Sequence, residues 1–353
     1  MSTRTKRYDN ERQLSFEEET STPKRQYGSL KSPYNQNQYQ HSHDHCYTHR
    51  QLQMTRNYHC YPLSTRQVLA NYGYALTNCP KLGYGRYSKV CQGTHLRTSK
   101  KIAIKIIDTR KVTQEYKCKF LPREIQTWKR LRHPNLVALF GVFEEAGKIY
   151  LPMELAEKGD LLTFVQQNGA QAESIAQSWM KQLISAVYYM HMRSIAHRDL
   201  KLENILLFAD NSIKIADFGF CREFKAQNGD LSKTFCGSKS YSAPEILLGQ
   251  EYIPFKADVW SLGVVAFVLV TNRMPYNERV ASNTIIVEAQ RNRTYHYSKK
   301  LQLSQMCQST IDTMMTFDYH IRPDIQQAMN LPWFHLPITP VERKESGASC
   351  TTV

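Results

Sequence analysis

Short apolar runs between residues 74 and 155 have the pattern of β-strands. They are rich in β-branched and aromatic residues, are separated by turn-forming or charged connectors, and cover residues 74–83, 87–96, 101–108, 136–145 and 148–155. Between the third and fourth runs, Pro122 stands where a helix can begin, and Ile125, Trp128 and Leu131 follow at spacings that give one apolar face. The pattern predicts a small sheet interrupted by one helix.

Beyond residue 160 the apolar positions recur with a helical period. Ile175, Trp179, Leu183 and Val187 fall on one stripe of a long helix, and further helices are expected as far as about His335. The segment "VWSLGVVAFVLV" (259–270) is shorter than the about 20 apolar residues that cross a bilayer. Because it is apolar on all faces, we interpret it as a buried helix and predict no membrane span. The order is a small β-rich unit followed by a larger helical one, and ligand sites favour the cleft between such units.

The two ends of the chain differ in composition from this central part. Residues 1 to about 70 are mainly rich in Gln, Tyr, Ser, His and Arg without sustained periodicity, which predicts a disordered tail. The cluster from His41 to His49, which includes Cys46, could hold a metal, but a flexible polar tract is the favoured interpretation. Residues 336–353 are expected to form a flexible end, whose last residues "TTV" could also dock as a strand in a PDZ domain.

Charge and cysteine usage bear on partners and compartment. The formal net charge of +15 favours acidic partners such as nucleotides, nucleic acid, anionic membranes or acidic proteins. Nine cysteines without a paired C-x-x-C spacing indicate reduced thiols, and the N-terminus has no secretory apolar run. We therefore expect an intracellular protein in the cytoplasm, with the nucleus as a second compartment.

Polar residues capable of catalysis gather in "AHRDLKLENILL" (196–207). Asp199 could accept a proton from an attacking hydroxyl, Lys201 could neutralise a transferred phosphoryl group, and the amide oxygen of Asn204 could bind a hard cation. A few residues later, the β-prone run "IKIADFGF" presents a second carboxylate, Asp217, just past a strand. Two metal ligands are thus predicted to flank one site.

An ordered series of motifs resembles the eukaryotic protein kinases: a G-x-G loop in "KLGYGRYSKV", then "IAIK", a helix glutamate, H-R-D, D-F-G and A-P-E, over residues 74–335. The resemblance implies an α+β, bilobal kinase fold with a small β-rich N-lobe and a larger α-helical C-lobe. It also implies ATP and Mg²⁺ as cofactors and transfer of a phosphoryl group to protein substrates.

The resemblance assigns roles residue by residue. Lys105 would hold the α- and β-phosphates and pair with Glu124, whereas Asn204 and Asp217 would bind the metal. Catalysis would fall to Asp199, Lys201 and Asn204. The nucleotide-binding residues would be Leu82, Gly83, Gly85, Val90, Ala103, Lys105, Glu124, Met153, Glu154 and Leu155.

The glycine-rich loop departs from the usual pattern. Ser88 stands where a third glycine is common, but backbone amides hold phosphates in such loops, so a small serine is compatible with function. Tyr84 lies between the two glycines and could cover the phosphates or slow nucleotide exchange. A working loop is the prediction.

Two further groups of residues have implied structural or regulatory roles. Arg198, beside the predicted catalytic aspartate, would bind a phosphate on the activation segment, and Thr234 is the candidate acceptor, phosphorylated by an upstream kinase or by the enzyme itself. Glu245 and Arg322 match a structural ion pair of the family, and Asp258 would anchor the backbone of the catalytic loop.

The form "HRDLKLEN" and the stretch "TFCGS" resemble serine/threonine kinases. Together with "FLPREI", "DFGFCREF" and "LSKTFCGS" they are similar to the testis-specific serine/threonine kinases, which implies a role in sperm formation. The implied substrate-binding residues are Asp160, Glu203 and Ser238, with a preference for arginine three residues before the acceptor. Ser15, three residues after Arg12, is then an autophosphorylation candidate, and a monomer is expected.

Two other classes remain open at this point. A pseudokinase scaffold would keep the fold without phosphoryl transfer, but the motif residues that transfer requires are present. A nucleic-acid-binding protein fits the basic stretches "RTSKKIAIK" and "WKRLRHPN", yet no groove-reading helix motif or zinc finger accompanies them. Nucleic acid is therefore not predicted as a partner.

Overall fold

The computed structural model describes residues 63–77, 82–85, 87–224, 231–234, 237–335 and 337. Predictions for the polar N-terminal tract, the histidine and cysteine cluster, Ser15 and the C-terminal "TTV" lie outside the described residues. Within them, the α+β, bilobal architecture is confirmed.

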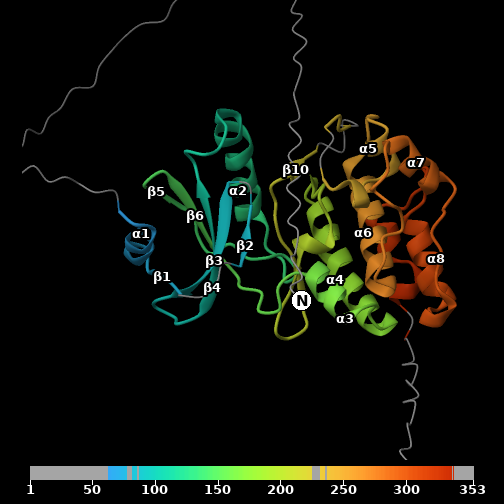
Figure 1. The fold of residues 1–353 in the computed structure, drawn as a ribbon, viewed down its shortest axis with the longest axis horizontal. Helices are drawn as coiled ribbons and strands as arrows, with labels where there is room; N and C mark the ends of the chain where they lie inside the picture. The colour runs from blue at the N-terminus through green and yellow to red at the C-terminus, as the bar shows by residue number, and fades with distance from the viewer. Residues whose placement is uncertain are drawn as a thin grey trace, which may run out of the picture. The chain divides into compact units, whose positions relative to one another are not determined.

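The N-lobe is an antiparallel sheet in the strand order β1-β3-β4-β6-β5, with β2 paired to β3. The strands are β1 (Tyr74–Leu76), β2 (Gly83–Tyr84), β3 (Ser88–His95), β4 (Lys101–Asp108), β5 (Phe143–Glu145) and β6 (Lys148–Met153). Figure 1 shows these strands side by side, with helix α2 (Leu121–Arg130) beside them. The predicted runs 87–96, 101–108 and 148–155 contribute most of their length to this sheet, and the run 74–83 contributes its first three residues and its last.

The run 136–145 is an exception, because only Phe143–Glu145 forms a regular strand. Its earlier part is apolar for another reason: Leu136 and Val137 are buried. The Val137 carbonyl accepts a hydrogen bond of 2.7 Å from the indole of Trp128 on α2. Leu136 and Leu139 make only isolated bridges, to Ile215 and Met153, so this apolar stretch is buried without forming a regular strand.

The folded part begins earlier than the sequence pattern predicted. Helix α1 (Thr65–Asn71) starts with a capping box in which the Ser64 hydroxyl and the Gln67 side chain bond each other's backbone amides. Its Val68 and Leu69 are fully buried in a cluster with Ile102, Ile104, Ile106 and Tyr150 of the sheet. The predicted extension of the disordered tail to residue 70 is therefore wrong for this helix, whose few apolar residues gave too short a pattern to recognise.

Helix α2 begins with Pro122 in its first turn, as predicted, and its apolar face buries Ile125 and Trp128. It is preceded without a break by a π-helical turn, η1 (Tyr116–Phe120), in which the amide of Leu121 donates to the carbonyl of Tyr116. This wider turn was not predicted from the sequence.

The C-lobe is mainly helical. Its helices are α3 (Leu161–Asn168), α4 (Glu173–His191), α5 (Pro244–Leu247), α6 (Pro254–Thr271), α7 (Asn283–Arg291), α8 (Gln305–Met314) and α9 (Ile325–Met329). Short 3-10 turns are η2 (Leu202–Asn204), η4 (Lys239–Tyr241), η5 (Lys299–Leu301) and η6 (Pro332–Phe334). Two small antiparallel pairs complete it: β7 (Ile195–Ala196) with β10 (Arg222–Glu223), and β8 (Ile205–Leu207) with β9 (Ile213–Ile215).

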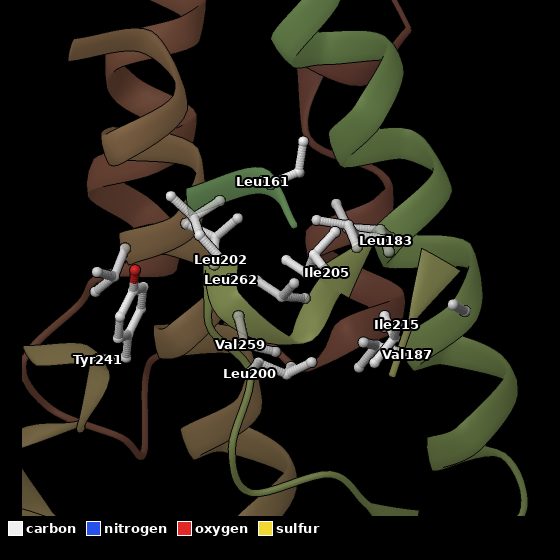
Figure 2. Packing of buried hydrophobic residues seen from close by; sticks show 14 of the residues in the cluster. Leu161, Leu183, Val187, Leu200, Leu202, Ile205, Ile215, Tyr241, Val259 and Leu262 are labelled. Carbon is white, nitrogen blue, oxygen red and sulfur yellow. The ribbon is translucent and has the colours of Figure 1, made fainter. Parts of the chain in front are cut away.

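Helix α6 contains the apolar segment 259–270. Within the described ranges it alone has the length and composition of a membrane-crossing helix, but 83% of its apolar window is buried inside the protein. Figure 2 shows Val259 and Leu262 of α6 in one apolar cluster with Leu183 of α4 and with Leu200 and Leu202 of the loop after β7. The helix is thus the core element that supports this loop.

Candidate active site

Lys105 on β4 faces two carboxylates from distant parts of the chain. Its Nζ lies 3.0 Å from Oε1 of Glu124 on α2 and 3.5 Å from Oδ1 of Asp217, which follows β9. The lysine side chain remains 17% exposed, whereas Glu124 is 2% exposed. The predicted Lys105–Glu124 pair is confirmed, and the lysine keeps a face open to a ligand.

The charges of Lys105, Glu124 and Asp217 shift the pKa values of Lys105 and Asp217. Burial alone would lower the pKa of the Lys105 ammonium, but the Glu124 and Asp217 carboxylates outweigh burial and raise it above its ordinary value. The Lys105 charge in turn lowers the pKa of Asp217 despite partial burial. Lysine and aspartate are therefore both ionised at neutral pH, which suits binding of an anion together with a cation.

Asp258 of α6 anchors the backbone of the predicted catalytic loop, residues 197–204. The buried Asp258 carboxylate accepts hydrogen bonds of 2.8 Å from the backbone amides of both His197 and Arg198, and it lies 2.9 Å from Nε2 of His191. Arg198 adopts a left-handed backbone conformation with φ of 65°, which is uncommon for a side chain of this size. The predicted anchoring role of Asp258 is confirmed, and it explains how the strained loop is maintained.

Asp199, Lys201 and Asn204 converge at the end of this loop. Lys201 Nζ lies 2.9 Å from Asp199 Oδ2, and the Asn204 amide donates bonds of 2.9 Å to both the Asp199 carbonyl and Oδ2. Asp199 Oδ1 is buried and has no hydrogen-bond partner among the described residues. A carboxylate oxygen without a partner keeps its full capacity to accept a hydrogen bond.

Gly237 of the activation segment packs directly over this aspartate. A Cβ at Gly237 would lie 2.9 Å from the Arg198 carbonyl and 3.3 Å from Asp199 Oδ1, and its φ of 95° disfavours other residues. The neighbouring Ser238, predicted to bind substrate, accepts a hydrogen bond of 3.0 Å from Lys201 Nζ. The predicted activation segment therefore reaches Asp199 and Lys201.

Asp217 is fixed in place by the two residues that follow it, Phe218 and Gly219. Phe218 is fully buried, with its ring 5.4 Å from that of Trp128 on α2 and 5.9 Å from that of His197. Asp217 has a left-handed φ of 57° and accepts a bond of 3.3 Å from the amide of Gly219. This anchoring aims the carboxylate of Asp217 toward Lys105.

The oxygen ligands expected for a metal fit this geometry. Asn204 uses its amide nitrogen for Asp199, which leaves its oxygen for a cation, and the ionised Asp217 supplies a carboxylate. No group of three His, Cys, Asp or Glu side chains suited to a metal occurs in the described part of the chain. A pair of oxygen ligands completed by phosphates and water is how Mg²⁺ is commonly held, so these residues fit it.

The glycine-rich loop is a β2–β3 hairpin beside Lys105, because Val90 and Lys105 are paired across β3 and β4. Ser88 and Gly85 exchange backbone hydrogen bonds of 2.9 and 3.4 Å across the turn. A Cβ at Gly85 would come within 2.6 Å of Ser88 Oγ, so the serine occupies space that the glycine leaves free. Tyr84 is 73% exposed.

The remaining predicted nucleotide residues divide into two kinds. Ala103 and Met153 are cross-strand neighbours on β4 and β6, and Leu82 and Leu155 present partly exposed apolar surface. The Glu154 side chain instead bonds Lys214 at 2.7 Å and the amide of Ala138 at 2.8 Å. Only the backbone of Glu154 is therefore suited to contact a ligand.

Arg198 has partners from the segment after Asp217. It donates 2.8 Å to the Phe220 carbonyl and 3.4 Å to the buried Ser232 hydroxyl, which also accepts from the amide of Thr234. Its guanidinium and that of Arg222 both lie against the Phe224 ring, at 5.7 and 4.9 Å. Arg222 was not identified from the sequence, since only the β7–β10 pairing brings it near Arg198.

Predicted substrate carboxylates differ in how they are used. Asp160 caps α3, where its oxygens accept bonds of 2.8 and 2.9 Å from the amide and hydroxyl of Thr163. Glu203 is exposed. Burial first, and then the charges of Glu203 and Glu278, raise the pKa of Tyr241. Glu278, which was not singled out from the sequence, therefore lies close enough to Tyr241 to act on the same hydroxyl as Glu203.

Comparison with known proteins supports this geometry. The protein kinase domain model matches residues 76–334. The chain is 38% identical to testis-specific serine/threonine-protein kinase 3 of Mus musculus over 75% of this chain and 97% of that protein. It is 36% identical to testis-specific serine/threonine-protein kinase 4 of Homo sapiens over 70% of this chain and 78% of that protein. It is also 43% identical to a serine/threonine-protein kinase SIK3 homolog of Danio rerio, over 62% of this chain and 18% of that protein.

An ordered set of motif residues thus meets in one site, and both the domain match and the relatives agree on its type. The chain belongs to the protein kinase domain family and is a protein serine/threonine kinase.

Proposed function

We propose that Asp199 is the catalytic base that accepts the proton of the substrate hydroxyl. The observation that carries this assignment is that Asp199 Oδ1 has no hydrogen-bond partner among the described residues, whereas Oδ2 is held by Lys201 and Asn204. A carboxylate with one oxygen fixed and the other unpaired is oriented for proton acceptance.

The surrounding residues divide the remaining tasks. ATP with Mg²⁺ supplies the transferable phosphoryl group and the metal charge when bound. Lys105 is placed to hold phosphate oxygens, Asn204 and Asp217 to hold the metal, and Lys201 to neutralise charge beside Asp199. A competent set of charged residues argues against a pseudokinase scaffold.

The test is phosphate transfer from labelled ATP to a serine peptide by the wild type and by Asp199→Asn. Transfer should fall about 10²–10⁴-fold in the variant, the usual contribution of general acid–base catalysis. Binding of a nonhydrolysable ATP analogue should be retained, since Asp199 does not belong to the predicted nucleotide set. Undiminished transfer by Asp199→Asn would contradict the assignment.

We propose a preference for basic residues before the acceptor, with arginine at the third preceding position. Asp160, Glu203 and Glu278 support it, because exposed or partly exposed carboxylates attract a guanidinium. Asp160 has two oxygens engaged in capping, but a carboxylate offers about four lone-pair sites and so retains capacity.

Asp160→Asn separates substrate recognition from capping, because asparagine caps a helix about as well as aspartate. The variant should lose part of the preference for an arginine peptide over its alanine counterpart, without a change in melting temperature. Asp210→Asn, an exposed carboxylate in the β8–β9 turn, is the matched control. If the wild type phosphorylates the arginine peptide and its alanine counterpart equally well, the proposal is contradicted.

We propose that phosphorylation of Thr234, by an upstream kinase or by the enzyme itself, activates the kinase. Arg198 and Arg222 share the Phe224 ring, and Arg198 already contacts Ser232, two residues before Thr234. A phosphate there could be bound by two guanidinium groups and would order the segment. Thr234→Ala should lower activity, and fully active enzyme with unmodified Thr234 in a mass-spectrometric map would contradict this.

We propose a role in sperm differentiation, in the cytoplasm and also in the nucleus of germ cells. The support is that several relatives are testis-specific serine/threonine-protein kinases by name, and it is similarity alone. Immunostaining of testis and of somatic tissues tests it. Staining confined to somatic tissue would contradict it.

A further inference from the structure

Tyr116 lies beside the predicted Lys105–Glu124 pair and was not identified from the sequence. Its hydroxyl donates a hydrogen bond of 3.3 Å to Oε2 of Glu124, while Oε1 of the same carboxylate faces Lys105 at 3.0 Å. Glu124 is therefore held from two sides, one oxygen by the lysine and the other by the tyrosine. Without the second partner, the buried carboxylate would be free to rotate about its terminal bonds.

The contact depends on the unusual turn before α2. Eight residues of regular α-helix advance by about 12 Å, so side chains eight positions apart do not normally meet. Tyr116 opens the π-helical turn η1, whose bond from the Leu121 amide spans five residues. Side chains of helical residues also tilt toward the N-terminus, which directs Glu124 back toward Tyr116. Single π-turns are frequent at functional sites, and here the turn accompanies a contact with the ion pair.

The tyrosine is suited to remain a donor. Its side chain is partly buried, and burial, followed by the nearby Glu124 charge, raises the pKa of its hydroxyl above the ordinary value. Loss of the proton at neutral pH would place two negative charges side by side. The hydroxyl therefore stays protonated and points a donor at the carboxylate.

Tyr116 also contacts the glycine-rich hairpin. Its ring lies 6.4 Å from that of Tyr87, one residue before β3, and 6.5 Å from that of Phe120 at the end of η1. Tyr87 is joined to the next strand by the bond from the Asp108 amide to its carbonyl. One residue thus touches both the helix that carries Glu124 and the loop predicted to cover the phosphates.

We propose that Tyr116 is a positioning residue that fixes the Glu124 carboxylate against Lys105 and so prepares Lys105 for nucleotide phosphates. The proposal rests on the nucleotide role given to Lys105 above. Tyr116 touches neither the reacting hydroxyl nor the catalytic base, so its effect is expected on nucleotide binding and not on the binding of the peptide.

The test is a double-mutant cycle on the full chain, with affinity for a nonhydrolysable ATP analogue and Mg²⁺ measured by calorimetry. The proteins are the wild type, Tyr116→Phe, Glu124→Gln and the double variant, and each melting temperature is recorded. Phenylalanine keeps the ring contacts and removes only the hydroxyl. Tyr188→Phe, on α4 away from the site, is the matched control.

Tyr116→Phe should weaken nucleotide binding about three- to tenfold, which is the range that the net contribution of one intramolecular hydrogen bond usually spans. The same change in the Glu124→Gln background should have little further effect, because residues that act through one contact are not additive. The KM for ATP should rise while the KM for the peptide stays constant.

Three results would overturn the proposal. If Tyr116→Phe leaves the affinity for the ATP analogue unchanged, the proposal is contradicted. If Tyr116→Phe lowers the affinity equally in the wild type and in Glu124→Gln, Tyr116 acts independently of Glu124. If Glu124→Gln itself leaves affinity unchanged, the role given to the Lys105–Glu124 pair fails, and this proposal fails with it. The single Glu124→Gln measurement separates that last failure from the first two.

Discussion

The ion pairs Lys105–Glu124 in the N-lobe and Arg322–Glu245 in the C-lobe each join separate segments of this kinase. Both glutamates are 2% exposed. Arg322, however, is fully buried, whereas Lys105 retains 17% exposure and a second carboxylate at 3.5 Å. Burial of a charge is thus common to both pairs, and the difference lies in what remains available to a ligand.

The Arg322–Glu245 pair is saturated. The guanidinium binds both carboxylate oxygens at 2.7 and 3.0 Å, donates to the carbonyls of Thr316, Lys256 and Phe317, and lies 5.0 Å from the centre of the Trp260 ring. The pair predicted from the sequence is therefore confirmed as a structural one. A buried charge in such a network stabilises mainly by leaving nothing unpaired.

The Lys105–Glu124 pair is not saturated, because one lysine face lies open beside Asp217, which follows the strand β9. A buried ion pair is therefore a candidate functional site when its geometry leaves charge uncommitted. Substitutions at and near the two pairs test this difference.

The largest effect is expected from Arg322→Met, which leaves Glu245 buried without its partner. Loss of one member of a buried pair destabilises by about 3–5 kcal/mol. Thermal and urea denaturation should show this loss, with nucleotide affinity of the folded protein preserved. If the melting temperature does not move, the pair is not structural. Glu245→Leu combined with Arg322→Met should recover part of the stability.

Lys105→Met should affect activity far more than stability. Removing one preorganised charge at a reacting phosphate costs about 10²–10³-fold in rate. Glu124 keeps the Tyr116 hydroxyl as a donor, so the fall in melting temperature should be smaller than in Arg322→Met. Steady-state kinetics beside thermal melts measure both quantities. A variant as unstable as Arg322→Met but active would reverse the comparison.

A smaller effect is expected in the glycine-rich hairpin next to Lys105. Gly85→Ala brings a Cβ within 2.6 Å of Ser88 Oγ, and crowding at the lower end of the overpacking range costs about 1 kcal/mol, or about fivefold in nucleotide affinity. Ser88→Gly should restore affinity to Gly85→Ala. No rescue in that double variant would show that the clash is not the cause.

The smallest effect is expected at the exposed pair of Asp108 and Arg110. The hydrogen bond from Arg110 lowers the pKa of Asp108 from 3.8 to about 2, so the pair contributes above pH 3.8 and loses its contribution as the pH falls through about 2. Arg110→Gln should barely change the melting temperature at neutral pH, because exposed pairs contribute little. Its difference from the wild type should shrink below pH 4, and a difference that grows with acid would contradict the assignment.

Much of the site was predictable because its residues are specified by local motifs. Lys105 stands in an apolar strand, Asn204 directly precedes the apolar run 205–207, and Asp217 follows the β-prone run 213–216. The two ion pairs follow from the same ordered series of motifs. Such residues are predictable without knowing the path of the chain between them.

The remaining features depend on contacts that no local pattern contains. Tyr116 reaches Glu124 only through a π-turn, and Arg222 reaches the Phe224 ring beside Arg198 only through the β7–β10 pairing. Helix α1 buries two apolar residues, too few for a period. The Leu136–Val137 stretch was apolar like a strand, but it is held by the Trp128 indole of α2 and by an isolated bridge to Ile215.

The most direct test of the comparison is calorimetric binding of a nonhydrolysable ATP analogue with and without Mg²⁺, in the wild type, Asp217→Asn and Glu245→Gln. The unsaturated site predicts tighter binding with Mg²⁺ in the wild type and in the folded Glu245→Gln variant, and loss of that gain in Asp217→Asn. Equal dependence on Mg²⁺ in all three proteins would contradict the claim that uncommitted charge beside Lys105 forms the nucleotide site.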